Sequence, residues 1–206
     1  MDAPDPLAAD ILAFWFGPQS APSANTARDV WFRKDAAFDA EIRKRFGDAT
    51  AVALAGGYGE WCTTAGGALA RVLLLDQFTR NIHRDTPAAF AGDARALATA
   101  EYAIDRGFDR TLDAIDRGFD RTLDACGRWF LYLPFEHAED RVMQERSLAL
   151  FGALARETGL AGPLEWAQKH ADVVARFGRY PHRNAILGRV STPEELAFLG
   201  QPGSRF

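Results

Sequence analysis

The chain has 206 residues, of which 48% are hydrophobic and 12% aromatic, and this composition excludes a largely disordered protein. The length suffices for one domain with a sizeable core, and we expect a single domain over residues 1–206. The formal net charge of −4 argues against nucleic-acid binding, which usually requires a basic domain.

The sequence also predicts a cytoplasmic protein without a membrane partner. No positive region precedes an apolar stretch near the first residue, and no apolar run approaches the ~18 residues that span a membrane. The two cysteines, Cys62 and Cys126, have no metal-binding or redox spacing and are interpreted as small core residues in a reducing compartment.

Helical patterns follow one another along the chain. Asp5 is a suitable N-cap for a first helix, with proline at the first helical position, and Gly17 ends it. Residues 18–27 have the composition of a loop. Apolar residues at helical spacing over residues 38–46 predict the next helix, after which Asp48 is expected to cap a short separate helix.

The segment Ala68–Leu75 is apolar on nearly every side, which is typical of a central helix. Four hydrogen-bonding residues lie together in its continuation: Asp76, Gln77, Arg80 and Asn81. Because unpaired burial of such groups is costly, they must find partners. Two interpretations stay open: a buried network that joins helices, or the polar floor of a cleft in which Asp76 orients Arg80 or acts as a base.

Residues 103–113 are repeated without change as residues 114–124. Because eleven residues span about three α-helical turns, the two copies keep their apolar positions in one stripe. A helix that begins at Thr86 leads into this duplication through Ile104. We expect one copy to form a helix–turn–helix and the other to extend a helix or lengthen the turn.

The C-terminal half continues the helical pattern. Pro134 is expected to end one helix, and Gly159 and Gly178 to follow the ends of the next two. Thr192 begins a capping box that predicts a last short helix. Since no stretch alternates with a period of two, the fold class is predicted to be all-α, with stacked antiparallel helix pairs.

Glu136, His137 and Glu139 follow the expected helix end at Pro134. They are interpreted either as caps and inter-helix hydrogen-bonding groups or as a carboxylate–histidine arrangement for acid–base chemistry. The spacing is not that of a zinc motif, and nothing like His-Glu-x-x-His occurs. We therefore predict no metal and no cofactor.

The segment from Arg176 to Arg189 holds four arginines and a histidine, and no acid occurs between Asp172 and Glu194. Arginine's planar fork suits carboxylate and phosphate groups, so this segment is a candidate anion site. Alternatively, its arginines pair with acids of the core. We expect Arg176 and Arg189 to hold the fold. The residues predicted to bind a ligand are Arg179, His182, Arg183 and Asn184.

Three long motifs, Leu73–Asn81, Phe130–Glu139 and Arg176–Asn184, resemble the bacterial domain of unknown function 924 family. The resemblance spans nearly the whole chain. It is specific, because several long motifs occur in the order that the family has. It implies an all-α fold similar to tetratricopeptide-repeat proteins, and it implies no activity. The duplication over residues 103–124 departs from the family pattern, which has one copy.

The sequence thus supports a helical protein that binds a small anionic molecule or a peptide carboxylate in a cleft lined by arginine and histidine. One alternative is an enzyme in which His137, His182 or Asp76 performs acid–base chemistry and arginines stabilise negative charge. The other is a structural adaptor without a ligand. These hypotheses differ in whether residues 76–81, 136–139 and 179–184 converge on one cavity.

Overall fold

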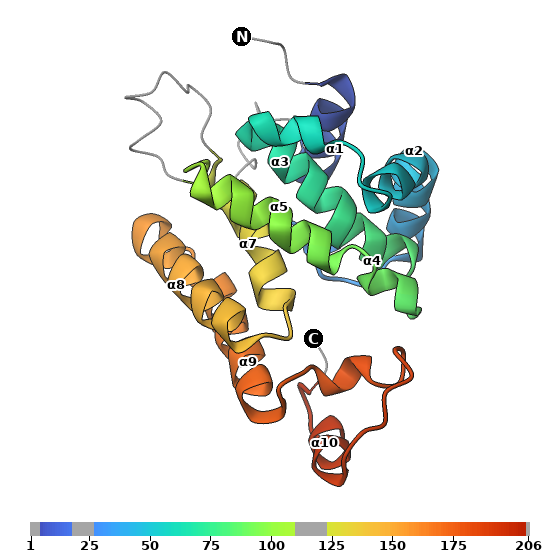
Figure 1. Ribbon diagram of the computed structural model, residues 1–206, viewed down its shortest axis with the longest axis vertical. Coiled ribbons are helices and arrows are strands. Elements are labelled where there is room, and N and C mark those ends of the chain that lie inside the picture. Colours follow the sequence, from blue (N-terminus) through green and yellow to red (C-terminus); the bar gives the residue numbers. More distant parts are fainter. Residues whose placement is uncertain (1–4, 18–26, 110–122, 205–206) are drawn as a thin grey trace.

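The computed structural model in Figure 1 describes residues 5–17, 27–109 and 123–204. Every regular element within these ranges is helical, which confirms the all-α prediction. None of the helices in the described ranges is long and apolar enough to cross a membrane. The single-domain organisation and the likeness to tetratricopeptide repeats stay predictions.

The N-terminal part packs its helices around one long helical rod. The α-helices of this part are α1 (Pro6–Phe16), α2 (Ala36–Leu54), α3 (Ala65–Val72), α4 (Thr79–Ile82) and α5 (Asp93–Asp105). Between α3 and α4 runs the π-helical turn η3 (Leu73–Phe78), so that the three form the rod. Short 3-10 turns occur at η1 (Asp29–Trp31), η2 (Gly59–Thr63) and η4 (Pro87–Phe90).

The C-terminal part adds α7 (Ala125–His137), α8 (Arg141–Thr158), α9 (Gly162–Phe177), the 3-10 turn η5 (Pro181–Arg183) and α10 (Pro193–Leu199). Figure 1 shows α8 and α9 side by side, with α7 between them and α5, and α10 at the end of the molecule away from α1. Gly159 and Gly178 follow the ends of α8 and α9 in the left-handed conformation, as predicted. The capping box at Thr192 is also present.

The main core joins the rod to α1 and α7 through aromatic rings. Trp15, Phe78 and Phe130 are fully buried, and the ring centroids of Trp15 lie 5.5 Å from Phe78 and 5.4 Å from Phe130. Full burial of a side chain of this kind contributes roughly 1.5–3 kcal/mol relative to exposure. The rod and α7, which carry the polar motifs, are therefore fixed in the best-packed part of the molecule.

Two predicted helix boundaries are wrong. Asp48 does not cap a separate helix, because α2 continues through it to bury Ala49 and Ala53 in the core. Pro134 does not end a helix either, since it lies inside α7. There, the side-chain amide of Gln144 donates to the backbone carbonyls of Phe135 and Glu136, at 3.3 and 2.8 Å. Tertiary packing and this cap outweigh the local signals.

The helix expected from Thr86 to Ile104 is divided. A 3-10 turn, η4, is followed by Gly92 and only then by α5. Beyond α5 the chain turns at Gly107, which has a φ of 74°. Residues 110–122, which include most of the second copy of the duplication, lie outside the described residues, and so does the prediction for their structure.

Candidate functional site

The polar end of the central rod begins in the π-helical turn η3. Turns of this kind are rare and occur frequently at functional sites, because the extra residue per turn changes which way side chains point. Here the turn includes Asp76 and Gln77, both buried. The hydroxyl of Thr79 donates to the carbonyl of Leu74 at 2.9 Å, which satisfies one backbone acceptor of the widened turn.

The Asp76 carboxylate accepts hydrogen bonds from three side chains. Arg80 Nη1 and His137 Nδ1 lie 2.8 and 2.7 Å from Oδ1, and Gln77 Nε2 lies 2.5 Å from Oδ2. Burial by itself would raise the pKa of Asp76, but the charge of Arg80 and the contact with His137 outweigh it and lower that pKa. Asp76 is therefore an ionised carboxylate inside the core.

His137 is the last residue of α7, and its side chain is 16% exposed. Burial lowers the pKa of the imidazole even though Asp76 opposes this shift, so the ring is neutral at neutral pH. Because an ionised carboxylate can only accept, Nδ1 carries the proton that Asp76 receives. No described residue bonds to Nε2 of His137, which leaves a lone pair suited to accept a proton or a hydrogen bond.

Asp93, at the start of α5, joins two arginines from opposite ends of the sequence. Its carboxylate lies 2.9 Å from Arg80 Nη1 and 3.2 Å from Arg183 Nη1. The Arg183 guanidinium also lies over the rings of Phe90 and Tyr180, with centroids at 4.7 and 4.6 Å. Stacking and the ion pair together fix the Arg183 head group in place.

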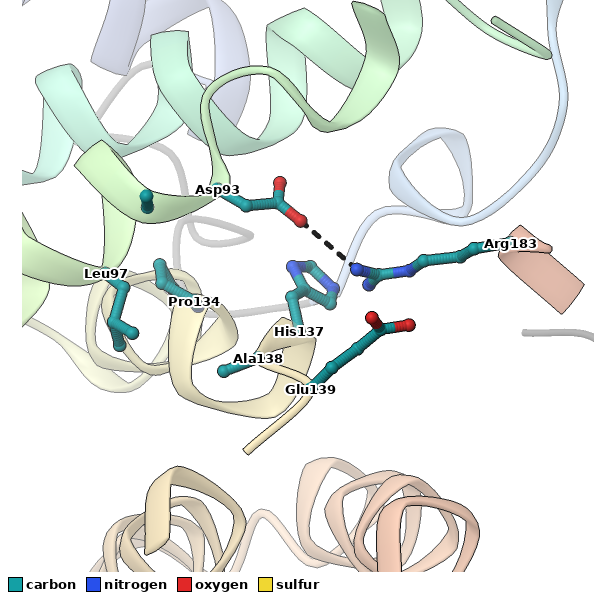
Figure 2. A pocket seen from close by; sticks show the side chains of 8 residues that line it. Asp93, Leu97, Pro134, His137, Ala138, Glu139 and Arg183 are labelled. Carbon is teal, nitrogen blue, oxygen red and sulfur yellow. Dashed lines mark hydrogen bonds and ion pairs between the residues drawn. The ribbon is translucent and has the colours of Figure 1, made fainter. Parts of the chain in front are cut away.

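A cavity of about 240 Å³ opens beside these groups. Its lining consists of four polar or charged residues and four apolar ones, namely Asp93, His137, Glu139 and Arg183, and Ala94, Leu97, Pro134 and Ala138. Figure 2 shows the imidazole of His137, the guanidinium of Arg183 and the carboxylates of Asp93 and Glu139 pointing toward one another. All three sequence motifs therefore meet at this pocket. Two of them supply residues of its lining, and the third, on the rod, contacts the lining through Asp76 and Arg80.

Three buried guanidinium donors around the pocket make no hydrogen bond in the described part of the chain. They are Arg183 Nε, whose residue lines the pocket, and Arg80 Nη2 and Arg189 Nε, whose residues pair with the lining. Buried donors are nearly always paired, so these positions call for an oxygen that the described residues do not supply. Burial and the charge of Arg80 lower the pKa of Arg183, although an arginine stays protonated in proteins.

Glu136 and His170 form a second polar cluster next to His137, and both of its side chains are uncharged at neutral pH. Glu136 Oε1 is 3.2 Å from His170 Nδ1, which also lies 2.9 Å from the carbonyl of Trp166. Burial raises the pKa of Glu136 to about 8, with a smaller contribution from Asp76, and burial lowers the pKa of His170 to about 3. At neutral pH both side chains are therefore uncharged, and His170 is a buried histidine of the core.

Several predicted ligand residues lie outside the pocket lining. Arg179 donates to both oxygens of Glu195, at 2.7 and 2.8 Å, and Asn184 donates to Glu195 at 3.2 Å, so that both hold α10. Asn81 donates to Asp39 on α2 at 2.7 Å. His182 is half-buried beside Tyr180, and burial lowers its pKa to about 4.

The two arginines predicted to hold the fold do make such contacts. Arg189 pairs with both oxygens of Glu139, at 2.5 and 2.8 Å, and Arg176 pairs with Glu194 at 2.8 Å on the surface. The site residue that the sequence did not reveal is Asp93. Its only signal is its position as an acid in the first turn of α5, and acids there are common because they favour the helix dipole.

Comparison with known proteins agrees with the resemblance of the three motifs. A model of the bacterial protein family of unknown function DUF924 matches residues 11–203. The solved structure of ATU0120, a protein of unknown function from Agrobacterium tumefaciens, superposes with a TM-score of 0.76 at 42% sequence identity, and covers 94% of this chain and 97% of that one. No curated protein matches.

Proposed function

Because the chain belongs to the DUF924 family of bacterial proteins of unknown function, we propose its function from the pocket: it binds the carboxylate of a small ligand at Arg183. The observation that supports this proposal is the buried donor Nε of Arg183, a residue of the pocket lining, which has no acceptor among the described residues. A ligand oxygen would complete it.

The setting of Arg183 suits such a role. Its head group lies over two aromatic rings and is paired with Asp93, so little conformational entropy is lost when a ligand binds. Hydrogen bonds between guanidinium and carboxylate are charge-assisted and directional. The cavity of about 240 Å³ lies below the ~300–1,000 Å³ of sites for drug-sized molecules. A small metabolite therefore fits better than a peptide.

Calorimetric titration with isocaproate, a small branched carboxylate, tests the proposal. We expect saturable binding to the wild type and binding at least about tenfold weaker to Arg183→Gln, since a charged hydrogen bond contributes about 1.5–3 kcal/mol. Arg176→Gln is the matched control, because Arg176 is an arginine of the same segment that pairs on the surface. Equal affinity of Arg183→Gln and wild type would contradict the proposal.

A second candidate function is catalysis, and one observation favours it. His137 lines the cavity with Nδ1 bound to an ionised carboxylate and Nε2 without a described partner. A histidine oriented in this way serves as a general base in enzymes. In this function His137 would accept a proton from the bound ligand, and Asp76 would position the ring and stabilise the imidazolium that forms.

Binding and catalysis are separated by His137→Gln. If the pocket is catalytic, incubation with a pool of small carboxylates in deuterium oxide produces an exchanged or converted compound that NMR detects. His137→Gln abolishes this product while it retains binding of the same compound, because Arg183 is unchanged. A wild-type protein that binds a carboxylate and leaves every compound of the pool unaltered rules out the catalytic function for that pool.

A further inference from the structure

We infer that the ligand of this pocket is a zwitterion, an α-amino acid with a small aliphatic side chain. The inference rests on the proposed binding of a carboxylate at Arg183 and adds what binds the rest of the ligand. It comes from three features of the pocket: the balance of its charges, the adjacency of opposite charges in its lining, and its apolar wall.

The charges at the pocket cancel. Three arginines, Arg80, Arg183 and Arg189, face three carboxylates, Asp76, Asp93 and Glu139, and every one of the six is paired within this group. His137 adds no charge at neutral pH. A simple anion would bring an uncompensated negative charge into a half-buried site, and the cost of desolvating an unbalanced charge is large. A ligand of zero net charge avoids this cost.

Opposite charges also lie side by side in the lining. Asp93 Oδ2 is 3.2 Å from Arg183 Nη1, and the Glu139 carboxylate lies on the other side of the same guanidinium in Figure 2. The ammonium and carboxylate of an α-amino acid are attached to one carbon, so they need partners at just this kind of spacing. The ammonium has three donors, and the carboxylates beside Arg183 retain lone pairs that can accept them.

The remaining wall of the cavity is apolar. Leu97 and Pro134 line it together with two alanines, Ala94 and Ala138, and present no hydrogen-bonding side chain. This wall is suited to an aliphatic side chain, whose burial contributes about 0.8 kcal/mol for each methylene. The cavity volume of about 240 Å³ corresponds to roughly eight water molecules at ~30 Å³ each, which accommodates a residue of the size of leucine.

Three matched probes test the inference on the wild-type protein. L-Leucine carries both charges, isocaproate lacks the ammonium and isopentylamine lacks the carboxylate, while the aliphatic skeleton is the same. By calorimetry we expect leucine to bind at least about tenfold more tightly than either analogue, because each analogue loses one charged partner. No variant is needed, so a folding defect cannot imitate the result.

The other outcomes separate this inference from the proposed function. Isocaproate that binds as tightly as leucine overturns the zwitterion and leaves carboxylate binding in place. Isopentylamine that binds as tightly as leucine, or a protein that binds none of the three, overturns both. As a second measurement, Asp93→Asn should weaken leucine binding at least about tenfold more than isocaproate binding. Both ligands use the Arg183 that Asp93 holds in place, but only leucine has an ammonium that pairs with the Asp93 carboxylate.

Discussion

At the scale of single residues, two buried carboxyl groups beside His137 ionise in opposite ways: Asp76 hydrogen-bonds to its ring, and Glu136 precedes it in the chain. Asp76 has Arg80, His137 and Gln77 as donors, and its pKa is lowered. Glu136 contacts the uncharged His170 and has no cationic partner among the described residues, and burial raises its pKa to about 8. Both share the same class of side chain and nearly full burial, so the difference comes from their hydrogen-bonding and charged neighbours.

Asp76→Asn tests the buried charge. The substitution preserves shape but leaves Arg80 without its closest carboxylate in the core, and the loss of one partner from a buried pair costs about 3–5 kcal/mol. We expect the free energy of unfolding in urea to fall by about that amount. Glu194→Gln breaks the exposed pair with Arg176 and should cost less than about 1 kcal/mol. If the two variants lose equal amounts of unfolding free energy, the buried Asp76 network stabilises the fold no more than an exposed ion pair does.

Glu136 predicts a slope of stability against pH. Its pKa is raised from 4.5 to about 8, so its contribution to stability is present below 4.5 and is lost as pH rises through 8. The lowered pKa values of His137, His170 and His182 act in the opposite direction below 6.5, their ordinary value. Between pH 6.5 and 8 the Glu136 effect dominates, and stability should fall by about 1.4 kcal/mol per pH unit at first and by about half of that near pH 8, where the folded Glu136 is half ionised.

Urea unfolding at several pH values measures this slope. Glu136→Gln cannot ionise and should flatten the curve between pH 6.5 and 8, while the decrease below 6.5, which depends on the histidines, persists. Parallel curves for the variant and the wild type in the upper window would mean that Glu136 is already ionised in the folded protein.

At the scale of elements, the start of α5 is placed by a close backbone contact. A Cβ added at Gly92 would lie 1.9 Å from the carbonyl oxygen of Leu75 in the π-helical turn, so only glycine allows this approach. The contact brings Asp93, the next residue, to the arginines of the site. The position of Asp93 therefore depends on a residue without a side chain.

Gly92→Ala tests this dependence. Because the opposing atom is backbone and cannot move aside cheaply, we expect a loss of about 1–3 kcal/mol in the free energy of unfolding, together with weaker ligand binding at Asp93 and Arg183. Gly162→Ala, at the start of α9, is the control, since nothing lies near its Cβ position and alanine favours the helix. If both substitutions leave stability and binding unchanged, the contact does not position the site.

The sequence predicts where helices form, but not where they are interrupted. The caps at Asp5, Gly178 and Thr192 depend on contacts within a few residues, and the structure confirms all three predictions. The predicted helix end at Pro134 is wrong because proline is only a local stop signal, whereas the cap from Gln144 comes from another helix. The π-helical turn has no local signature, since its apolar residues Leu73, Leu74, Leu75 and Phe78 fit α- and π-helical spacing alike.

At the scale of the whole molecule, the C-terminal segment 179–204 completes the pocket from outside the main core. Its apolar contact with α9 is small, with Tyr180 packed against Val173 and Val174. Polar contacts join it to the other elements: Arg183 to Asp93, and Arg189 and the Tyr180 backbone to Glu139. The pocket therefore depends on these pairs more than on apolar burial.

Glu139→Gln should loosen this segment selectively. The substitution removes the charge that holds Arg189, and hydrogen exchange over residues 179–204 should accelerate about tenfold or more, while α3 and α7 keep their protection. Mass spectrometry of exchanged peptides measures both regions in one sample. Hydrogen exchange that accelerates evenly over the chain, or not at all, would contradict a selective role of Glu139 in holding this segment.

The sequence could supply the polar motifs of the site but not their pairing. Asp76, His137 and Arg183 were all expected near a ligand, because each belongs to a dense polar segment. Which arginine meets which acid depends on how helices far apart in the chain pack, as with Arg179 and Asn184, which both contact Glu195. Composition cannot distinguish an arginine paired in the fold from one with a donor to spare.

The Nε–H resonance of Arg183 gives the most direct test of the central claim, that this guanidinium binds the carboxylate of a small ligand. The resonance is assigned in a ¹⁵N-labelled protein by its loss in Arg183→Lys. On titration with L-leucine or isocaproate, we expect a saturable downfield shift of this signal, because its proton gains a charged acceptor. An Arg183 signal that stays in place, while either ligand binds and shifts signals elsewhere, would contradict it.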